Sequence, residues 1–236
     1  MGHSVAGESV LRRVRSFVRR QGRMTEGQRR MLELHWQRYG VDHHDGMLDL
    51  DQLFARQAPR ILEIGFGMGG SLLQMARSHP QQDFLGIEVH RPGIASLLRG
   101  LEQEAITNVR VICDDAVTVL EHNIAPHSLS AVYLYFPDPW PKLRHHKRRI
   151  VQPAFVELVA SRLQAGGVFH MATDWQHYAS QAMSVLSASP SLFNRAGEQR
   201  FSERPGYRPL TKFEQRGRRL GHAVWDLIFE RRSDRG

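Results

Sequence analysis

Short apolar segments alternate with helical segments through the middle of the chain, and this alternation constrains the fold more than any other feature. Parallel strands need a crossover connection, which is usually a helix, so the alternation predicts an α/β fold with a mostly parallel sheet. Helices should then cover both faces of the sheet. Strands are expected from residue 60 to a glycine-rich turn and at 83–89, 109–114, 129–136 and 167–173. Helices are expected at 71–78, from Pro92 to about residue 106, and at 116–122, 151–163 and 175–187. Segments 193–201 and 223–231 are expected to be closing strands.

The length of 236 residues suffices for one generous domain or two small ones. No internal repeat or low-complexity linker divides the chain, so we expect a single domain over residues 31–236. Residues 1–30 carry eight arginines against two glutamates, which is too polar for a core segment. We expect them to form a basic N-terminal arm, and the sequence leaves open whether that arm is ordered.

Acidic residues recur at the ends of the predicted strands, where ligands bind in sheets of this kind. Carboxylates repel phosphates, but they accept hydrogen bonds from ribose hydroxyls and from adenine donors. A nucleoside cofactor without phosphates, such as S-adenosylmethionine, therefore fits this edge better than NAD does. The acids, in strand order, are Glu63, Glu88, Asp115, Asp138 and Asp174.

The turn Gly65-Phe-Gly-Met-Gly-Gly70 would let the backbone approach a ligand closely, because glycine has no side chain. By itself this is a weak signal, and its glycine spacing differs from the dinucleotide fingerprint. Glu88 lies about twenty residues further on, where a ribose-binding acid is expected. Asp115 and Asp174 have a second interpretation, because either could cap the helix that follows it.

The segment after the fourth predicted strand suggests chemistry on a nucleic-acid base. Asp138 stands between Pro137 and Pro139 and is followed by Trp140. Prolines fix φ and remove backbone donors, so this acid should be presented rigidly and the strand should end here. A rigid acid beside an aromatic plane suits a flat base, and the five cations within residues 142–149 suit phosphate.

The net charge of +8 is unevenly distributed. Residues 1–30 carry a net charge of +6, residues 138–150 of +4 and residues 200–236 of +5, whereas residues 31–137 carry −6. Isolated charge runs are often only solvated faces. Three basic segments around an acidic, cofactor-like middle favour a nucleic-acid partner, because phosphate binding is electrostatic.

Several classes of protein are disfavoured. No secretion signal or long apolar span is present, so we expect a cytoplasmic protein without membrane contact. The single Cys113 lies in an apolar run and cannot form an intrachain disulfide. The pairs His43-His44 and His145-His146 lack the Cys or carboxylate spacing of a zinc site, so no metal is expected. The oligomeric state is open, and we expect a monomer.

Four motifs together resemble the bacterial tRNA (guanine-N7)-methyltransferases over nearly the whole chain, from about Val14 to Arg231. Of these, the Pro-Asp-Pro-Trp and Thr-Lys-Phe-Glu segments are specific, whereas the glycine turn is not. The motifs are Glu63-Ile-Gly-Phe-Gly-Met-Gly69, Gly86-Ile-Glu-Val-His90, Phe136-Pro-Asp-Pro-Trp-Pro-Lys142 with Arg144-His-His-Lys-Arg-Arg149, and Thr211-Lys-Phe-Glu-Gln-Arg-Gly217.

The resemblance implies a class I, Rossmann-like methyltransferase fold and methyl transfer from S-adenosylmethionine to N7 of guanosine at tRNA position 46, in the variable loop. It also implies roles for residues that match the family motifs. The cofactor would be bound by Glu63, Gly65, Gly67, Glu88, Asp115 and Asp138, of which Asp138 would also be catalytic. Substrate would be bound by Lys142, Asp174, Thr211, Lys212, Phe213 and Glu214. RNA would be bound by Arg144, His145, His146, Lys147, Arg148 and Arg149.

Guanine N7 carries a lone pair and no proton, so its methylation needs no general base at that atom. An ionised Asp138 cannot usefully face N7 and O6, because both are acceptors. It could bind the N1–H and N2–H₂ donors and stabilise charge that migrates onto the base. We therefore expect Asp138 to position substrate and cofactor, although the sequence does not separate positioning, electrostatic stabilisation and proton transfer.

Two other classes of function are compatible with parts of the sequence. A nicotinamide-dependent oxidoreductase would share the α/β sheet, but Glu63 and Asp138 would repel a pyrophosphate at the glycine turn. An RNA-binding protein without enzymatic activity would explain the basic segments but not the series of acids at the strand ends.

Overall fold

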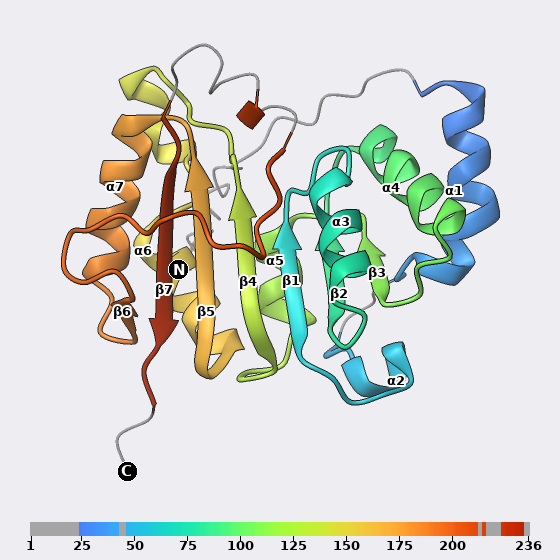
Figure 1. The fold of residues 1–236 in the computed structure, drawn as a ribbon, viewed down its shortest axis with the longest axis horizontal. Helices are drawn as coiled ribbons and strands as arrows, with labels where there is room; N and C mark the ends of the chain where they lie inside the picture. Colours follow the sequence, from blue (N-terminus) through green and yellow to red (C-terminus); the bar gives the residue numbers. More distant parts are fainter. Residues whose placement is uncertain (1–23, 43–45, 212–213, 216–222, 234–236) are drawn as a thin grey trace, which may run out of the picture.

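The computed structural model describes residues 24–42, 46–211, 214–215 and 223–233. Within these ranges, seven strands form one sheet in the order β3-β2-β1-β4-β5-β7-β6 (Figure 1). The first five strands in this order are parallel, and β7 runs antiparallel between β5 and β6. The strands are β1 (Arg60–Ile64), β2 (Asp83–Ile87), β3 (Val109–Ile112), β4 (Leu129–Tyr135), β5 (Leu163–Thr173), β6 (Leu192–Asn194) and β7 (Trp225–Arg231).

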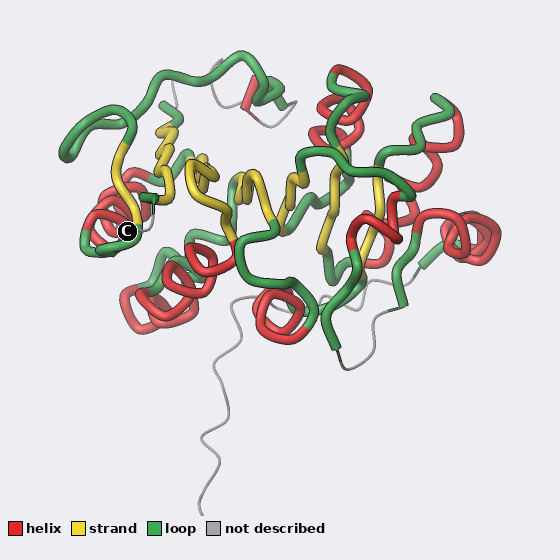
Figure 2. Tube along the Cα trace, turned by 90° about the horizontal axis from the view of Figure 1, so that it is seen from below, coloured by secondary structure: helices red, strands yellow, loops and turns green. Residues whose placement is uncertain are grey.

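Helices cover both faces of the sheet (Figure 2). One hydrophobic core joins the sheet to α5, α6 and α7, and a second core joins its other face to α1, α3 and α4. The helices are α1 (Glu26–Tyr39), α2 (Leu50–Phe54), α3 (Gly70–Ser78), α4 (Arg91–Gln103), α5 (Ala116–His122), α6 (Pro153–Arg162) and α7 (Gln176–Ser187), with a 3-10 helix η1 (Leu143–Arg148).

Among the described residues, a loop and not a helix lies in front of β7, β5 and β4 on the face that carries α1, α3 and α4 (Figure 1). This loop is the segment after β6. The ring of Tyr207 in this segment stacks on Tyr133 of β4 with 5.5 Å between the ring centroids. The C-terminal part of the chain therefore returns to β4, the strand that leads into the Pro-Asp-Pro-Trp segment.

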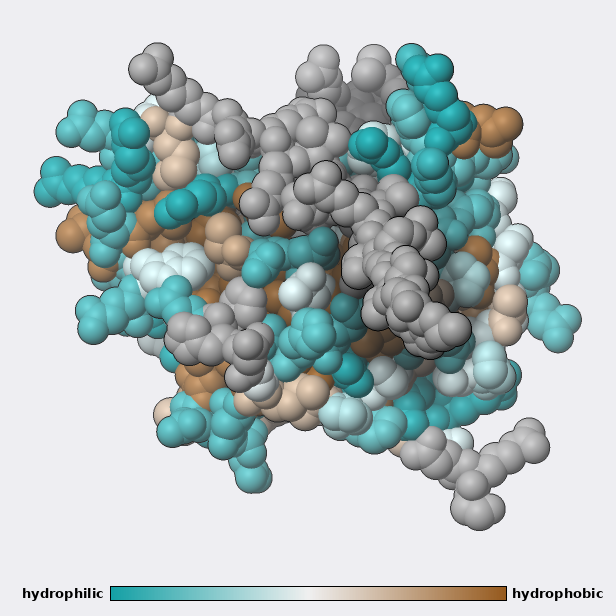
Figure 3. Space-filling model, turned by 180° about the vertical axis from the view of Figure 1, so that it is seen from behind, coloured by the Kyte–Doolittle hydropathy of each residue, from teal (hydrophilic) through white to brown (hydrophobic). Residues whose placement is uncertain are grey.

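The opposite face has the surface expected of the outside of a helical layer. Viewed from behind, hydrophilic side chains project from the molecule, and hydrophobic surface shows in smaller areas between them (Figure 3). Among the described residues, none of the helices has both the length and the apolar character needed to cross a membrane.

The predicted α/β fold is confirmed, with helices on both faces and an antiparallel closing strand. The predicted strand over 193–201 is wrong in extent: β6 has only three residues, and the chain then turns through Gly197 and Gln199, both with positive φ. Two helices, α1 and α2, were not expected from the sequence.

The boundary predicted at residue 30 falls inside α1, whose first turn is closed by a capping box between Thr25 and Gln28. Residues 1–23, which hold most of the predicted basic arm, lie outside the described residues. The domain division stays a prediction for that segment.

Candidate active site

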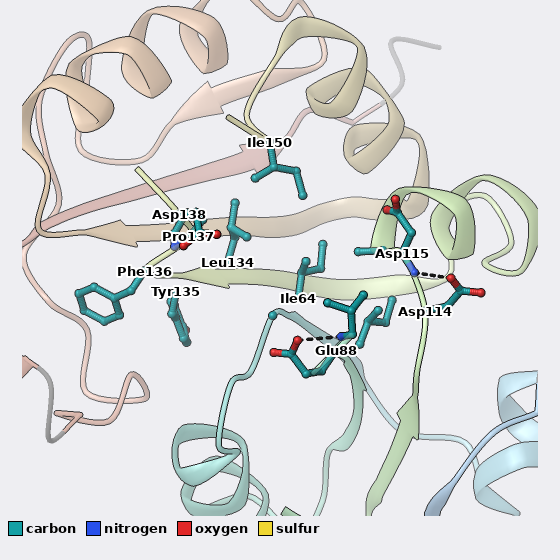
Figure 4. A pocket seen from close by; sticks show the side chains of 14 residues that line it. Ile64, Glu88, Asp114, Asp115, Leu134, Tyr135, Phe136, Pro137, Asp138 and Ile150 are labelled. Carbon is teal, nitrogen blue, oxygen red and sulfur yellow. Dashed lines mark hydrogen bonds between the residues drawn. The ribbon is translucent and has the colours of Figure 1, made fainter. Parts of the chain in front are cut away.

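A pocket opens at the carboxyl ends of β1, β2 and β4, next to the residues that follow β3 (Figure 4). Ile64 and Leu134 are among its apolar lining residues, and the acids Glu88, Asp115 and Asp138 are at its walls. We call it the strand-end pocket. It places the acids of three different strand ends around one cavity, as the sequence predicts.

The glycine turn after β1 needs backbone conformations that favour glycine. Gly65, Gly67 and Gly69 have φ values of +71°, +58° and +80°. A Cβ atom on Gly69 would approach Cβ of Leu97 to 2.6 Å, so α3 and α4 could not pack this closely with a larger residue. Gly65 lines the pocket, whereas Gly67 does not.

Glu88 ties the glycine turn to the end of β2. One carboxylate oxygen accepts from the N–H of Gly67 at 2.8 Å, and the other accepts from the N–H groups of Val89 at 2.7 Å and His90 at 2.9 Å. A carboxylate offers about four acceptor positions, so one remains for a ligand hydroxyl. Glu88 therefore both shapes the pocket and lines it.

Glu63 lies outside the pocket lining. Alternation along β1 turns its side chain away from the face of Leu62 and Ile64, and it is only 2% exposed. Burial, reinforced by repulsion from Glu88, raises the pKa of Glu63 to about 8. Its direct contact with a cofactor stays a prediction, and the residue in this conformation is a buried carboxyl group with one unpartnered oxygen.

Asp115 caps a helix and also lines the pocket, whereas its contact with a cofactor stays a prediction. Its carboxylate accepts a hydrogen bond from Val117 N at 2.9 Å and thereby caps α5, and the residue also lines the pocket. The neighbouring Asp114 lines the pocket too, and it accepts a hydrogen bond of 2.6 Å from Asp115 N (Figure 4). The sequence pattern does not single out Asp114, because it places this residue within the third predicted strand, 109–114.

Asp138 is exposed on the far side of the pocket from Asp114 and Asp115 (Figure 4). Phe136 and Trp140, on either side of it, have left-handed backbone conformations with φ of +51° and +45°. Such conformations cost a non-glycine residue about 1–3 kcal/mol each and persist only where the surroundings hold them. The segment from Phe136 to Trp140, which we call the acid turn, is thus a strained support for one accessible carboxylate.

Comparison with known proteins decides the family. Residues 57–227 match the family model described as a putative methyltransferase. The chain is 57% identical over 224 residues to the tRNA (guanine-N(7)-)-methyltransferase of Alcanivorax borkumensis, which covers 95% of this chain and 94% of the relative. It is 55% identical over 220 residues to the protein of the same name from Hydrogenovibrio crunogenus, covering 93% of this chain and 92% of that relative. The chain belongs to the tRNA (guanine-N(7)-)-methyltransferase family.

A solved structure supports the fold assignment. A variant of the 16S rRNA (adenine(1408)-N(1))-methyltransferase from Catenulisporales acidiphilia, determined with its cosubstrate S-adenosylmethionine, matches with a TM-score of 0.54 at 16% identity. The match covers 80% of this chain and 94% of that one. At this identity the likeness shows the class I methyltransferase fold alone, and it confirms the fold expected from the sequence.

The basic turn of this methyltransferase, residues 142–149, divides into outward and inward cations. Lys142, Arg144 and Lys147 are exposed. Arg148 is half-buried, with its guanidinium 4.8 Å from the centroid of the Trp140 ring. His145 and His146, also in this turn, have pKa values lowered by desolvation and by the neighbouring arginines, first among them Arg144 and Arg149 respectively.

Arg149 differs from the prediction that it contacts RNA. It is 1% exposed, and its guanidinium faces the interior of the protein. That prediction does not fit this conformation, because a phosphate has no access to a side chain so completely covered.

The predicted substrate segment at 211–214 is partly described, since Lys212 and Phe213 lie outside the described residues. Thr211 Oγ1 accepts a hydrogen bond from Glu214 N at 3.1 Å. The carboxylate of Glu214 is 1% exposed and receives two hydrogen bonds from Arg208, at 2.6 and 3.1 Å. Arg208 also donates to Asp226 of β7 at 3.0 Å. In this conformation Glu214 therefore anchors the segment to the sheet through Arg208, and its contact with a substrate stays a prediction.

Asp174 follows β5, as expected, and is half-buried outside the pocket lining. No side-chain hydrogen bond caps the start of α7, so the second interpretation of Asp174 as a helix cap is not confirmed. Within the described ranges, no three His, Cys, Asp or Glu side chains gather in a way that could hold a metal ion.

Proposed function

We propose that the protein transfers the methyl group of S-adenosylmethionine to N7 of a guanosine in tRNA, at position 46 in the variable loop. The observation that carries the proposal is the identity of 55–57% over more than nine-tenths of the chain to relatives named for guanine N7 methylation of tRNA. The acids of the strand-end pocket and the cations beside it support the same activity. Membership of a methyltransferase family decides against the oxidoreductase and the RNA-binding protein without enzymatic activity.

The strand-end pocket fits S-adenosylmethionine by its donor and acceptor groups. Glu88 and Asp115 offer acceptors for ribose hydroxyls and adenine donors, and the apolar side chains of Ile64 and Leu134 suit a flat ring. None of the described residues that line this pocket carries a cationic side chain, which suits a cofactor without phosphates. When bound, the cofactor supplies an electrophilic methyl group on a sulfonium.

Asp138 would orient the guanine. Its exposed carboxylate at the pocket rim can accept from the N1–H and N2–H₂ groups of the base, which leaves the N7 edge free to face the methyl group. The same charge stabilises the positive charge that develops on the ring. No proton has to leave N7, so orientation and electrostatics account for the role of this residue.

The exposed cations of the basic turn would hold the tRNA backbone. Lys142, Arg144 and Lys147 follow the acid turn directly and are accessible to phosphates. Contacts of this kind position a nucleic acid without reading its sequence. Action on tRNA places the protein, in this proposal, in the cytoplasm.

The proposal is tested by methyl incorporation from labelled S-adenosylmethionine into tRNA transcripts that carry guanosine or adenosine at position 46. Incorporation only into the guanosine transcript is the expected result. Incorporation into both transcripts to the same extent would refute the proposed position, and incorporation into neither would refute the proposed substrate.

A further inference from the structure

The acid turn is held by three arginines, of which Arg148 and Arg149 are adjacent in the basic turn and Arg208 lies in the loop that crosses the sheet. The guanidinium of Arg208 lies 5.7 Å from the ring centroid of Phe136, and that of Arg148 lies over Trp140. Arg149 acts on the backbone, because its Nε donates a hydrogen bond of 2.8 Å to the carbonyl oxygen of Pro139. Pro139 is the residue directly after Asp138.

The other side of the Arg149 guanidinium is bound to α7. NH1 donates to Oε1 of Gln181 at 3.1 Å and to Nδ1 of His177 at 3.0 Å. The guanidinium also lies 4.8 Å from the ring centroid of Tyr178, which belongs to the core under α6 and α7. One side chain thus connects the acid turn to a helix packed against the sheet.

Burial separates Arg149 from the other cations of the basic turn. It is 1% exposed, and its NH2 has no hydrogen-bond partner among the described residues. Lys147, only two residues earlier, is exposed. A buried cation is costly unless its contacts compensate, and the contacts of Arg149 go to Pro139 and α7.

We propose that Arg149 is a positioning residue, which fixes the place of Asp138 by holding the Pro139 carbonyl against α7, and that it takes no part in RNA binding. The inference rests on the proposed function, since the effect of Asp138 is measured as methyl transfer. A protein without methyl transfer in wild-type form would contradict the proposed function itself. Normal methyl transfer by the Arg149 variants would contradict only this inference.

The test compares Arg149→Gln with two other variants. Lys147→Gln removes an exposed cation of the same turn. Arg162→Gln removes a half-buried arginine that also donates to backbone carbonyls, at 2.7 Å to Leu120, but at the opposite end of the sheet. For each protein we would measure the single-turnover methyl-transfer rate at saturating tRNA and cofactor. For each protein we would also measure the tRNA Kd as a function of salt concentration and the midpoint of thermal unfolding.

Arg149→Gln should lower the saturating rate roughly 10- to 100-fold, because small misplacements of a catalytic group have effects of that size. Its tRNA Kd and salt slope should match those of the wild type. Lys147→Gln should weaken tRNA binding and reduce the salt slope by about one. Arg162→Gln should lower the thermal midpoint and leave the rate unchanged. Arg149→Lys should give an intermediate rate, because one ammonium cannot reproduce the planar fork that reaches both sides.

Two results would overturn the inference. If Arg149→Gln reproduces the binding defect of Lys147→Gln with a normal saturating rate, the residue contacts RNA. If it reproduces the pattern of Arg162→Gln, the residue is only structural. Should Arg149→Gln fail to fold, Gln181→Leu removes one acceptor and leaves the cation in place. A reduced saturating rate of Gln181→Leu with an unchanged tRNA Kd supports the positioning role of Arg149, and an unchanged rate rejects that role.

Discussion

The carboxylate of Glu88, at the end of β2, accepts a hydrogen bond of 2.8 Å from the backbone N–H of Gly67 in the turn after β1. Together with the N–H groups of Val89 and His90, this contact uses three of the four acceptor positions of the carboxylate. The acid expected to bind ribose therefore also determines the shape of the glycine turn beside the strand-end pocket. Its removal should affect both binding and stability.

Glu88→Ala should weaken S-adenosylmethionine binding by about 1.5–3 kcal/mol, the range for a hydrogen bond to a charged group. It should also destabilise the fold by about 1–3 kcal/mol, because three partly buried backbone donors lose their acceptor. Calorimetric titration and urea unfolding measure the two effects. Glu104→Ala is a matched control, since it breaks only an exposed ion pair with Arg77. Unchanged cofactor affinity in folded Glu88→Ala would refute the ribose assignment.

Asp138→Asn should retain measurable activity, because methylation of N7 requires no proton removal at that atom. Loss of charge-assisted hydrogen bonds of about 1.5–3 kcal/mol should slow single-turnover transfer roughly 10- to 150-fold. A pH–rate profile of both proteins is the measurement. Complete loss of activity at every accessible pH would favour a required base, and equal rates would exclude any catalytic role.

Glu63→Gln should change how stability depends on pH. Burial raises the pKa of Glu63 to about 8 in the folded protein, whereas the unfolded value is about 4.3. Between these values the folded state binds more protons, so wild-type stability should fall as pH rises, by at most about 1.4 kcal/mol per pH unit for one group. The variant should lack this contribution. Urea unfolding between pH 5 and 8.5 tests it, and identical pH dependence of the two proteins would contradict the raised pKa.

Arg208→Met should destabilise the protein by about 3–5 kcal/mol, because it leaves the buried carboxylates of Glu214 and Asp226 without their cation. Adding Glu214→Leu to this variant should recover part of the loss, which a double-mutant cycle of unfolding free energies would measure. Strictly additive effects would show that Glu214 does not act through Arg208. The prediction separates an anchoring role of Glu214 from direct substrate contact.

The strand ends were predictable from sequence because alternation of apolar and helical segments places the carboxyl ends of parallel strands at one edge. Glu88, Asp115 and Asp138 meet in one pocket for that reason. The face of the sheet on which the pocket opens was not predictable. Glu63 is only one residue from pocket-lining Ile64, yet the pleat of β1 removes it from the lining.

Contacts between segments that are distant in the sequence could not be predicted either. Lys147 and Arg149 stand in the same basic run, and only the packing of the turn against α7 separates an exposed cation from a buried one. In the sequence, nothing distinguishes Glu214 from a solvent-exposed acid. In the fold, Arg208 of the loop that crosses the sheet donates both to Glu214 and to Asp226 of β7. The end of β6 was likewise not predictable from the sequence. The strand ends at Asn194 because the chain turns there, and not because the following side chains lack strand propensity.

Methyl transfer to a tRNA transcript with 7-deazaguanosine at position 46 tests the central proposal most directly. This base keeps the N1–H and N2–H₂ donors and O6, and it replaces only N7 by a carbon. We expect the substituted tRNA to bind with the Kd of the unmodified transcript and to accept no methyl group, while the unmodified transcript is methylated. Equal methylation of both transcripts would show that N7 of that guanosine is not the acceptor.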